Sequence, residues 1–252
     1  MSYTIAVAGK GGTGKTTIAG LVIRYLAENK KTPILAIDAD PNSNLGDVLG
    51  ITPKENIGAI IDEISKNIDK IPAGMTKDRY IEYRVQSAIE ESSSLDLLAM
   101  GRPEGPGCYC YANNTLRNIN SKIASDYKFV VIDNEAGLEH LSRRTTRKAD
   151  CLLIISDPTP VGIKSAKRIY DLVKELNIEI KKFIVLVNRT KDSQDKEGIK
   201  KEFSKIKIDD LKFVPNDEEV LKLSLEGKPL MELEKGSVAL EAITSIMEAV
   251  CR

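Results

Sequence analysis

The 252-residue sequence has no excess of charge of either sign and no long hydrophobic run. Lysine and arginine together number 37, as do aspartate and glutamate, so the formal net charge is zero. This balance gives no global positive field that would hold nucleic acid or an anionic membrane. The longest apolar stretches, such as 151–156 and 183–187, have the length of strands, and the first residues enter a strand instead of a secretion signal. We therefore expect a cytosolic protein that binds neither nucleic acid nor membranes.

Cysteine is also scarce, with four residues in the chain. Four are too few for a disulfide scaffold at this size, and a close pair in a reducing compartment more often indicates metal or redox chemistry. The chain contains one close pair, Cys108 and Cys110 in the stretch GCYCY. Cys151 lies inside an apolar run and Cys251 near the end of the sequence, and we expect both of these thiols to be inert.

Short apolar runs alternate along the chain with stretches of helical pattern. The runs cover residues 3–8, 33–38, 95–100, 129–133, 151–156, 183–188 and 211–215. They lack an alternation of period two, which is typical of strands buried on both faces. The alternation of strands and helices predicts a doubly wound α/β fold, in which helices cover both faces of a mostly parallel sheet. We find no internal repeat and expect a single domain over residues 1–252.

Two sets of aliphatic residues recur with helical spacing, which predicts that each set faces the core. The first set is Ile57, Ile60, Ile61, Ile64 and Ile68, and the second is Ile169, Leu172, Val173 and Leu176.

The segment after the first expected strand, GKGGTGKTT at residues 9–17, satisfies the pattern G-x-x-x-x-G-K-[ST]. Its glycines let backbone N–H groups converge on phosphate oxygens, and the positive end of the following helix faces the same point. We expect Lys15 to pair with the β- and γ-phosphates and the Thr16 hydroxyl to complete a Mg²⁺ shell. The expected nucleotide-binding residues of this loop are Gly11, Gly12, Thr13, Gly14, Lys15, Thr16 and Thr17.

Three aspartates follow the ends of expected strands. Asp38 and Asp40 lie in DADPNSNL, and Asp133 lies in FVVIDNEAG. The carboxyl ends of parallel strands form the edge where α/β sheets bind ligands. A single aspartate at such a place is weak evidence, because aspartate is also a common helix N-cap. Three of them combined with a phosphate loop predict a magnesium-nucleotide site.

The phosphate loop carries a second lysine, Lys10, in the pattern K-G-G-x-G-K-T-[ST]. This pattern resembles the deviant Walker A motif of the MinD/ParA/nitrogenase-iron-protein class of ATPases. The resemblance implies that Lys10 reaches across a dimer interface and adds positive charge to the partner's transferring phosphoryl group. It also implies that Asp38 and Asp133 belong to the Mg²⁺ shell, and that Asp40 orients or deprotonates the attacking water. The alternative is that Lys10 is a solvated loop charge.

Polar residues also follow the last two expected strands. Asn188 comes after the first of them, and Pro215, Asn216 and Asp217 come after the second. Relatives in the same class hold adenine at such positions, where the asparagine amide offers both a donor and an acceptor. Ordinary turn residues are the alternative. The dipeptide NR at 188–189 lacks the guanine signature N-K-x-D, which favours ATP over GTP.

Cys108 and Cys110 can converge on one soft cation, but they supply only half of a tetrahedral shell. A symmetric dimer brings four sulfurs together, and the dimer implied by Lys10 provides the axis. A pair of buried packing thiols is one alternative, although the polar, Gly/Pro-rich neighbourhood argues against burial. A local redox couple is another, although a C-x-C disulfide closes a small strained ring.

The segments AGKGGTGKTT, DADPNSNL, CYC and DNEAGLEHLSRR occur in this order. Their combination resembles the CooC-type ATPases, the nickel-maturation factors of carbon monoxide dehydrogenase and acetyl-CoA synthase. The resemblance implies a cytosolic ATPase that dimerises with ATP, binds Ni²⁺ or Zn²⁺ through the paired cysteines, and has one of these enzymes as its client. His140 and the basic residues Arg143, Arg144 and Arg147 fit a surface that docks the client. A structural role for His140 is the alternative.

Two other functions fit parts of the sequence. The first is an iron–sulfur carrier or a reductase like the nitrogenase iron protein. Carriers of this class use C-x-x-C, not C-x-C. The reductase places its two cluster cysteines far apart, one of them in the segment after the Walker B aspartate, and residues 134–144 contain no cysteine. The second is a positioning switch that binds membrane or DNA, like septum-site and plasmid-partition relatives. Segment 237–252 is amphipathic, yet its charged residues are Glu241, Glu248 and Arg252. A membrane-surface helix needs lysine and arginine on its polar face.

Overall fold

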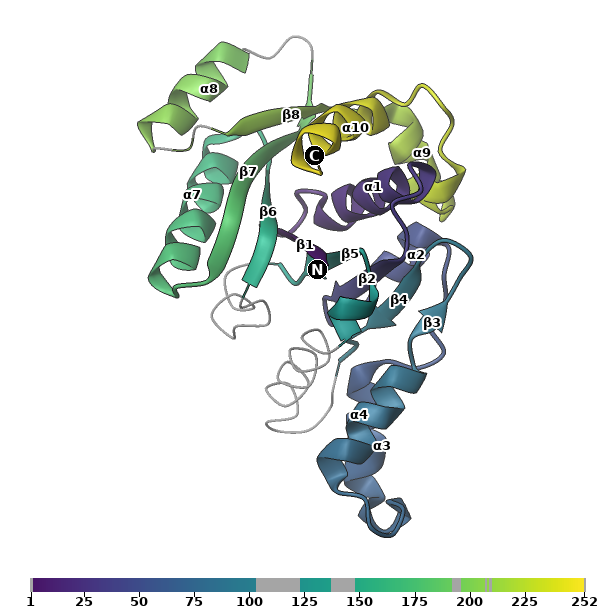
Figure 1. Ribbon diagram of the computed structural model, residues 1–252. Coiled ribbons are helices and arrows are strands. Elements are labelled where there is room, and N and C mark those ends of the chain that lie inside the picture. The colour runs from purple at the N-terminus through teal and green to yellow at the C-terminus, as the bar shows by residue number, and fades with distance from the viewer. Residues whose placement is uncertain are drawn as a thin grey trace.

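A computed structural model describes residues 2–102, 123–136, 148–191, 196–206, 208 and 210–251. In these ranges eight strands form one sheet in the order β3-β4-β2-β5-β1-β6-β7-β8 (Figure 1). Among these pairs only β3 and β4 are antiparallel. The strands are β1 (Tyr3–Gly9), β2 (Ile34–Ala39), β3 (Glu90–Glu91), β4 (Asp96–Ala99), β5 (Phe129–Asn134), β6 (Lys148–Ser156), β7 (Glu179–Thr190) and β8 (Leu211–Pro215).

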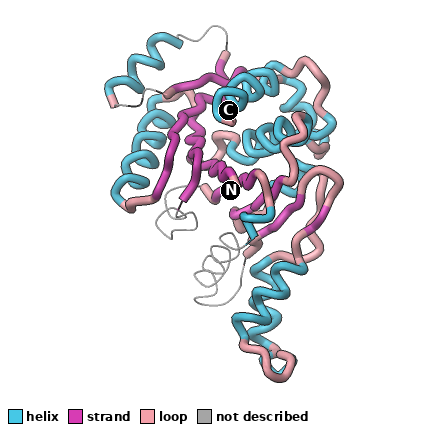
Figure 2. Tube along the Cα trace, in the orientation of Figure 1, coloured by secondary structure: helices cyan, strands magenta, loops and turns pink. Residues whose placement is uncertain are grey.

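Helices cover both faces of this sheet (Figure 2). The α-helices are α1 (Lys15–Glu28), α2 (Leu45–Leu49), α3 (Ile57–Lys66), α4 (Lys77–Ser87), α7 (Pro160–Glu175), α8 (Lys196–Lys205), α9 (Glu218–Glu226) and α10 (Val238–Val250). Short 3-10 turns are η1 (Ile68–Lys70), η2 (Ala124–Asp126) and η3 (Leu230–Glu232). The predicted α/β class with a mostly parallel sheet is therefore confirmed, and every predicted strand is present.

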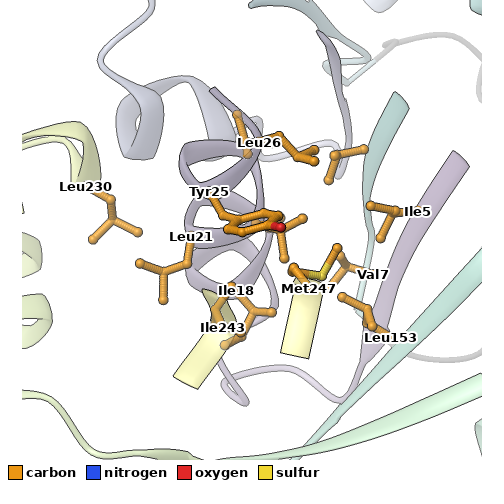
Figure 3. Packing of buried hydrophobic residues seen from close by; sticks show 14 of the residues in the cluster. Ile5, Val7, Ile18, Leu21, Tyr25, Leu26, Leu153, Leu230, Ile243 and Met247 are labelled. Carbon is orange, nitrogen blue, oxygen red and sulfur yellow. The ribbon is translucent and has the colours of Figure 1, made fainter. Parts of the chain in front are cut away.

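One face of the sheet packs against α1 and α10 (Figure 3). Leu21 and Tyr25 of α1 lie in the same cluster as Ile243 and Met247 of α10 and Ile5 of β1. The buried residues of α10 are Ala239, Leu240, Ile243, Ile246, Met247 and Val250. The apolar side of this amphipathic helix is thus part of the core, so the same side cannot lie on a membrane surface while the fold is intact.

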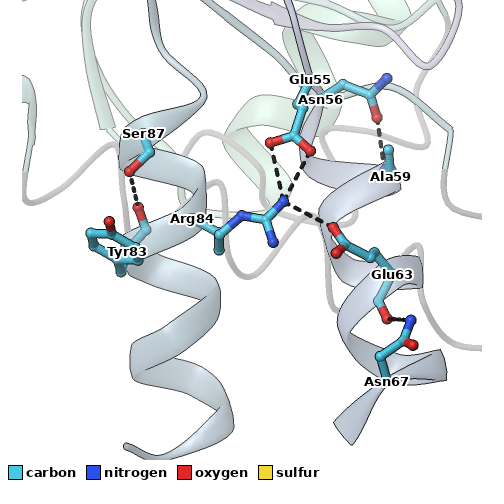
Figure 4. Close-up of polar contacts among 8 residues, drawn as sticks. All are labelled: Glu55, Asn56, Ala59, Glu63, Asn67, Tyr83, Arg84 and Ser87. Carbon is cyan, nitrogen blue, oxygen red and sulfur yellow. Dashed lines mark hydrogen bonds and ion pairs between the residues drawn. The ribbon is translucent and has the colours of Figure 1, made fainter. Parts of the chain in front are cut away.

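The opposite face of the sheet carries two hydrophobic clusters, one beneath α7 and α8 and one beneath α3 and α4. Ile60 of α3 and Ile37 of β2 belong to the second cluster. Beyond the sheet, α3 and α4 pack side by side as an arm (Figures 1 and 4). Arg84 of α4 fastens the arm, because its guanidinium donates to Glu55 and to Glu63 at 2.9 Å each. The packing of α3 against α4 therefore combines a shared apolar cluster with the ion pairs of Arg84.

The prediction that Ile68 faces the core was wrong. Helix α3 ends at Lys66, and Ile68 lies in η1 with 58% of its surface exposed. Asn67 interrupts the helix with φ −132°, and its side-chain amide donates to the Glu63 carbonyl at 2.9 Å. Helical spacing places residues on one face only while the helix continues. Of the second set, Ile169 and Val173 are buried as expected.

Candidate functional site

The order of the strands changes direction at β1. This strand lies between β5 and β6, with β2 on the β5 side and β7 on the β6 side. Ligands bind open α/β sheets at such switch points, beyond the carboxyl ends of the strands. Residues 10–14 leave β1 there and lead directly into α1. The structure therefore places the predicted phosphate loop at the expected binding edge.

The phosphate loop is held by its own groups. The Thr13 hydroxyl donates to the Lys10 carbonyl at 2.8 Å. Gly14 has φ +90°, and a Cβ atom there would lie 2.5 Å from Nδ2 of Asn188. Within the described ranges no side chain caps α1 at Gly14, which leaves the first N–H groups of the helix available to bind phosphate. Lys15 is only 7% exposed, whereas Lys10 is an exposed residue at the rim of the loop.

Asp38 of β2 and Asp133 of β5 are direct neighbours in the sheet, and each is 1% exposed. Burial raises the pKa of Asp38 to about 7; the Leu45 N–H opposes this change and the Asp133 charge adds to it. Burial also raises the pKa of Asp133 to about 6, against the hydrogen bond from Thr16 and the charge of Lys15. Two neighbouring buried carboxylates with raised pKa values favour a cation at this place.

The residues predicted to hold Mg²⁺ fit that ion. Asp133 Oδ1 is buried and has no hydrogen-bond partner among the residues that the structure describes. The Thr16 side chain bonds to the same carboxylate, and Asp38 is adjacent. Proteins usually hold Mg²⁺ with one or two carboxylates, while waters and substrate phosphates complete its shell. Within the described ranges, no group of three or more His, Cys, Asp or Glu residues is arranged as a metal cluster.

Asp38 also fixes the loop that follows β2. Its Oδ1 accepts from the Asp40 N–H at 3.1 Å, and its Oδ2 accepts from the Leu45 N–H at 2.8 Å. Asp40 faces this same loop, because its Oδ1 accepts from both the backbone N–H and the side-chain amide of Asn42 at 2.9 Å. This arrangement is an Asx-type turn. The turn thus holds one of the two carboxylate oxygens of Asp40.

The four residues predicted to hold adenine line one cavity of about 80 Å³. Asn188, Pro215, Asn216 and Asp217 share this cavity with Thr17 of α1. Because Thr17 belongs to the helix that follows the phosphate loop, the cavity borders the place expected for phosphate. The structure thus brings together residues that lie far apart in the sequence.

The carboxylate of Asp217 is fully occupied by the protein. Its Oδ1 accepts from the N–H groups of Glu219 and Val220 at 2.9 and 3.3 Å, which caps α9. Its Oδ2 accepts from the Ser237 hydroxyl and the Ala239 N–H at 2.6 and 3.0 Å, at the start of α10. Four hydrogen bonds use the acceptor positions of a carboxylate. We therefore expect Asp217 to position the pocket rather than to bind adenine through its carboxylate.

Replacing Asp217 with asparagine should lower the free energy of unfolding by about 2–4 kcal/mol at pH 7, because the amide nitrogen would face donors. Burial alone raises the pKa of Asp217, but the hydrogen bonds from Ser237 and the backbone outweigh burial and hold this pKa below its ordinary value. The stabilisation is therefore complete above the unfolded pKa and is lost as pH falls through the folded pKa.

Urea unfolding of both proteins at pH 7 and near pH 3 measures this effect, and the difference should shrink at the lower pH. Glu219→Gln removes an exposed carboxylate from the same turn and serves as the control, with an expected change within about 0.5 kcal/mol. Equal stability of Asp217→Asn and the wild type at pH 7 would contradict the assignment.

Several predicted residues lie outside the described ranges, and their roles stay predictions. They are Cys108, Cys110, His140, Arg143, Arg144 and Arg147. Cys151 is fully buried in β6, as expected for a packing thiol.

Two polar residues of the site were not identified from the sequence. Asn134 is fully buried and donates to the Val7 carbonyl at 3.0 Å, which joins the ends of β5 and β1. Arg189 donates to the Gly12 carbonyl at 3.1 Å. The only sequence signal for these two residues is their position: Asn134 follows Asp133, which was predicted to hold Mg²⁺, and Arg189 follows Asn188, which was predicted to hold adenine. Their hydrogen bonds to the Val7 and Gly12 carbonyls depend on the local backbone geometry, which the pattern of hydrophobic residues does not predict.

The fold and the site together define a P-loop nucleotide-binding protein. A family model described as the CobQ/CobB/MinD/ParA nucleotide binding domain matches residues 4–230. The chain belongs to this family. Among the described helices, none combines the length and the hydrophobicity needed to cross a membrane.

Curated relatives agree with this assignment. An uncharacterized ATP-binding protein of Methanocaldococcus jannaschii is 42% identical, over 98% of this chain and 97% of the relative. The carbon monoxide dehydrogenase accessory protein CooC of Rhodospirillum rubrum is 34% identical, over 69% of this chain and 70% of the relative.

Solved structures show the same fold. MinD of Pyrococcus horikoshii OT3, complexed with Mg-ADP, has a TM-score of 0.72 at 21% identity and covers 99% of this chain and 96% of its own. A ParA family ATPase of Chlorobium tepidum TLS has a TM-score of 0.73 at 21% identity, over 97% and 96% of the two chains. The family match over residues 4–230 confirms the predicted MinD/ParA class.

Proposed function

We propose that the chain binds Mg-ATP and hydrolyses it. The observation that carries this proposal is the pairing of Asp38 and Asp133 on neighbouring strands, beside the buried Lys15. Buried charges are costly unless they meet a charged partner. Mg-ATP brings both a dication for the carboxylates and a polyphosphate for the lysine and the loop.

Each group then has a defined task. Lys15 pairs with the β- and γ-phosphates, and the loop N–H groups hold the phosphate oxygens. Thr16, Asp38 and Asp133 would hold Mg²⁺, which would supply positive charge beside the phosphoryl oxygens. Asp40 orients the attacking water or accepts its proton. Because Asn42 holds one carboxylate oxygen of Asp40 in the Asx-type turn, we expect hydrolysis to be slow until a partner rearranges residues 40–45.

Replacing Asp40 with asparagine should lower the rate of ATP hydrolysis at least about 100-fold and leave Mg-ATP affinity within about threefold. Asparagine can still accept from the Asn42 N–H, so the loop keeps its fold, but it cannot accept a proton from water. Phosphate release and calorimetric titration measure the two quantities. Asp47→Asn, an exposed carboxylate of α2, is the charge-matched control. If the Asp40→Asn variant hydrolysed ATP at the wild-type rate, Asp40 would have no role in the reaction.

We also propose a homodimer in which Lys10 completes the partner's site. The support is the exposure of Lys10 at the rim of a loop whose other lysine is buried. A lysine placed there can add positive charge to a phosphoryl group in a second chain. Since the γ-phosphate is the group that it would contact, ATP should tighten the dimer more than ADP does.

We propose further that this dimer is a cytosolic metallochaperone with Ni²⁺ or Zn²⁺ as its cargo, bound by Cys108 and Cys110 of both chains. Two kinds of observation support this function: the C-x-C pair, and the 34% identity to CooC, which is named a carbon monoxide dehydrogenase accessory protein. Carbon monoxide dehydrogenase or acetyl-CoA synthase would be the client.

A further inference from the structure

Strand β7 ends in an irregularity beside the phosphate loop. Its pairing with β8 shifts register between Val187 and Thr190, and Arg189 between them has φ +55°. A residue with a Cβ atom adopts this left-handed conformation only at a cost. Such strain persists where the surrounding structure fixes it, and it is concentrated at functional sites. We call Asn188 and Arg189 the β7 bulge.

Both side chains of the β7 bulge donate to carbonyls of the phosphate loop. Asn188 Nδ2 donates to the Thr13 carbonyl at 2.9 Å, and Arg189 Nη1 donates to the Gly12 carbonyl at 3.1 Å. The bulge is therefore a two-point contact with consecutive peptide groups. The absence of a Cβ atom at Gly14 leaves room for it, since a Cβ atom would lie 2.5 Å from Asn188 Nδ2.

Because peptide groups are planar, these two hydrogen bonds also set the directions of the N–H groups of Thr13 and Gly14. In a planar trans peptide the carbonyl and the following N–H point in opposite directions. Holding the Thr13 carbonyl turns the Gly14 N–H to the other side of the loop. Holding the Gly12 carbonyl turns the Thr13 N–H toward the Lys10 carbonyl, 3.4 Å away, which closes the turn of the loop. The β7 bulge thus holds the carbonyl side of these two peptide groups, opposite to the Gly14 N–H, which we expect to face phosphate.

The same bulge lines the cavity predicted to hold the base, together with Thr17 and residues 215–217. Backbone bonding connects the two loops of this cavity, because the Asn216 N–H donates to the Thr190 carbonyl at 2.8 Å. Asn188 retains one N–H and one lone pair for a ligand, since its Oδ1 accepts from the Arg189 N–H and its Nδ2 uses one hydrogen on Thr13. A base in the cavity would therefore contact the residues that hold the phosphate loop.

We propose that the β7 bulge couples base recognition to the phosphate loop, and that Arg189 is a positioning residue for nucleoside di- and triphosphates. This inference rests on the proposed function, because it requires the loop to bind phosphate. Arg189 acts through the Gly12 carbonyl and touches no phosphate itself. Loss of Arg189 should lower the affinity for ligands whose phosphates contact the whole loop. It should leave the affinity for ligands with a single phosphate nearly unchanged, because they contact less of the loop.

Arg189→Asn tests the proposal, because asparagine tolerates the left-handed conformation and the backbone of the bulge is kept. We expect Mg-ADP affinity to fall about fivefold and AMP affinity to change less than about twofold. Competition against a fluorescent ADP analogue measures both. Arg189→Gly, which also accepts φ +55°, should repeat the result, and Arg189→Lys should restore most of the affinity for ADP. The exposed Arg79→Asn on α4 controls for the lost charge and should match the wild type.

Unchanged ADP affinity in both Arg189→Asn and Arg189→Gly would overturn the inference. An equal fall in ADP and AMP affinity would also overturn it, because that result indicates damage to the whole site. A wild-type protein that binds neither nucleotide would instead refute the proposed function.

Discussion

Replacing Lys15 with alanine is expected to weaken Mg-ATP binding at least about 100-fold. In the proposed site the buried ammonium would make charge-assisted hydrogen bonds to two phosphates, each worth about 1.5–3 kcal/mol, and every 1.4 kcal/mol is tenfold in affinity. The substitution also removes the positive charge that lowers the pKa of Asp133. The carboxylate would then be a poorer ligand for the dication, which adds to the loss. Titration calorimetry with Mg-ATP measures the effect.

Lys10→Ala is the matched control, because it removes a lysine from the same loop at an exposed position. This variant should bind Mg-ATP with an affinity within about threefold of the wild type. In metal-free sedimentation with ATP it should stay monomeric, whereas the wild type should dimerise. If Lys15→Ala bound Mg-ATP like the wild type, the loop would not be the nucleotide site. If Lys10→Ala dimerised normally, its proposed role in the partner's site would be lost.

The sheet could be predicted because its strands carry strong signals. Strands such as 129–133 are continuous apolar runs, as strands buried on both faces must be. Two-residue β3, Glu90–Glu91, was missed because it contains no apolar residue and its pairing depends on β4. Ile68 was misplaced because its helix ends early, at Lys66, with Asn67 as the C-cap. Local side-chain bonds can end a helix where the apolar spacing still continues.

The sequence predicted which residues form the candidate site, but it did not predict how these residues are arranged relative to one another. Strand ends predicted that Asp38 and Asp133 share one edge, yet their direct pairing requires β2 beside β5, a neighbour relation that the sequence order does not state. The same limit applies to Asp217, which the sequence places after a strand while the fold surrounds it with four donors. Arg189 shows a third limit, since a left-handed φ at a residue other than glycine has no clear sequence signal.

Replacing both Cys108 and Cys110 with alanine is expected to abolish stoichiometric metal binding and to leave Mg-ATP binding unchanged. Two thiolates supply half of a tetrahedral shell, so one Ni²⁺ or Zn²⁺ per dimer needs both chains. Zn²⁺ should compete well with Ni²⁺ in vitro, because soft thiolate ligands accept either ion. Metal should also promote dimers, and by linkage dimerisation should raise metal affinity by the same factor.

Metal analysis and sedimentation of the wild-type and double-alanine proteins measure these effects. Cys251→Ala is the matched control, since it removes a half-buried thiol near the end of α10 and should keep the metal. Equal metal content in the wild type and the double variant would contradict the cysteine site, and one ion per chain in a monomer would contradict the shared shell. Visible iron–sulfide absorbance lost with the two cysteines would favour an iron–sulfur carrier. If the wild-type protein binds metal and its metal content changes with the nucleotide, the cargo is linked to the ATP-driven approach of the two chains. That approach can load or release an ion without reacting with it.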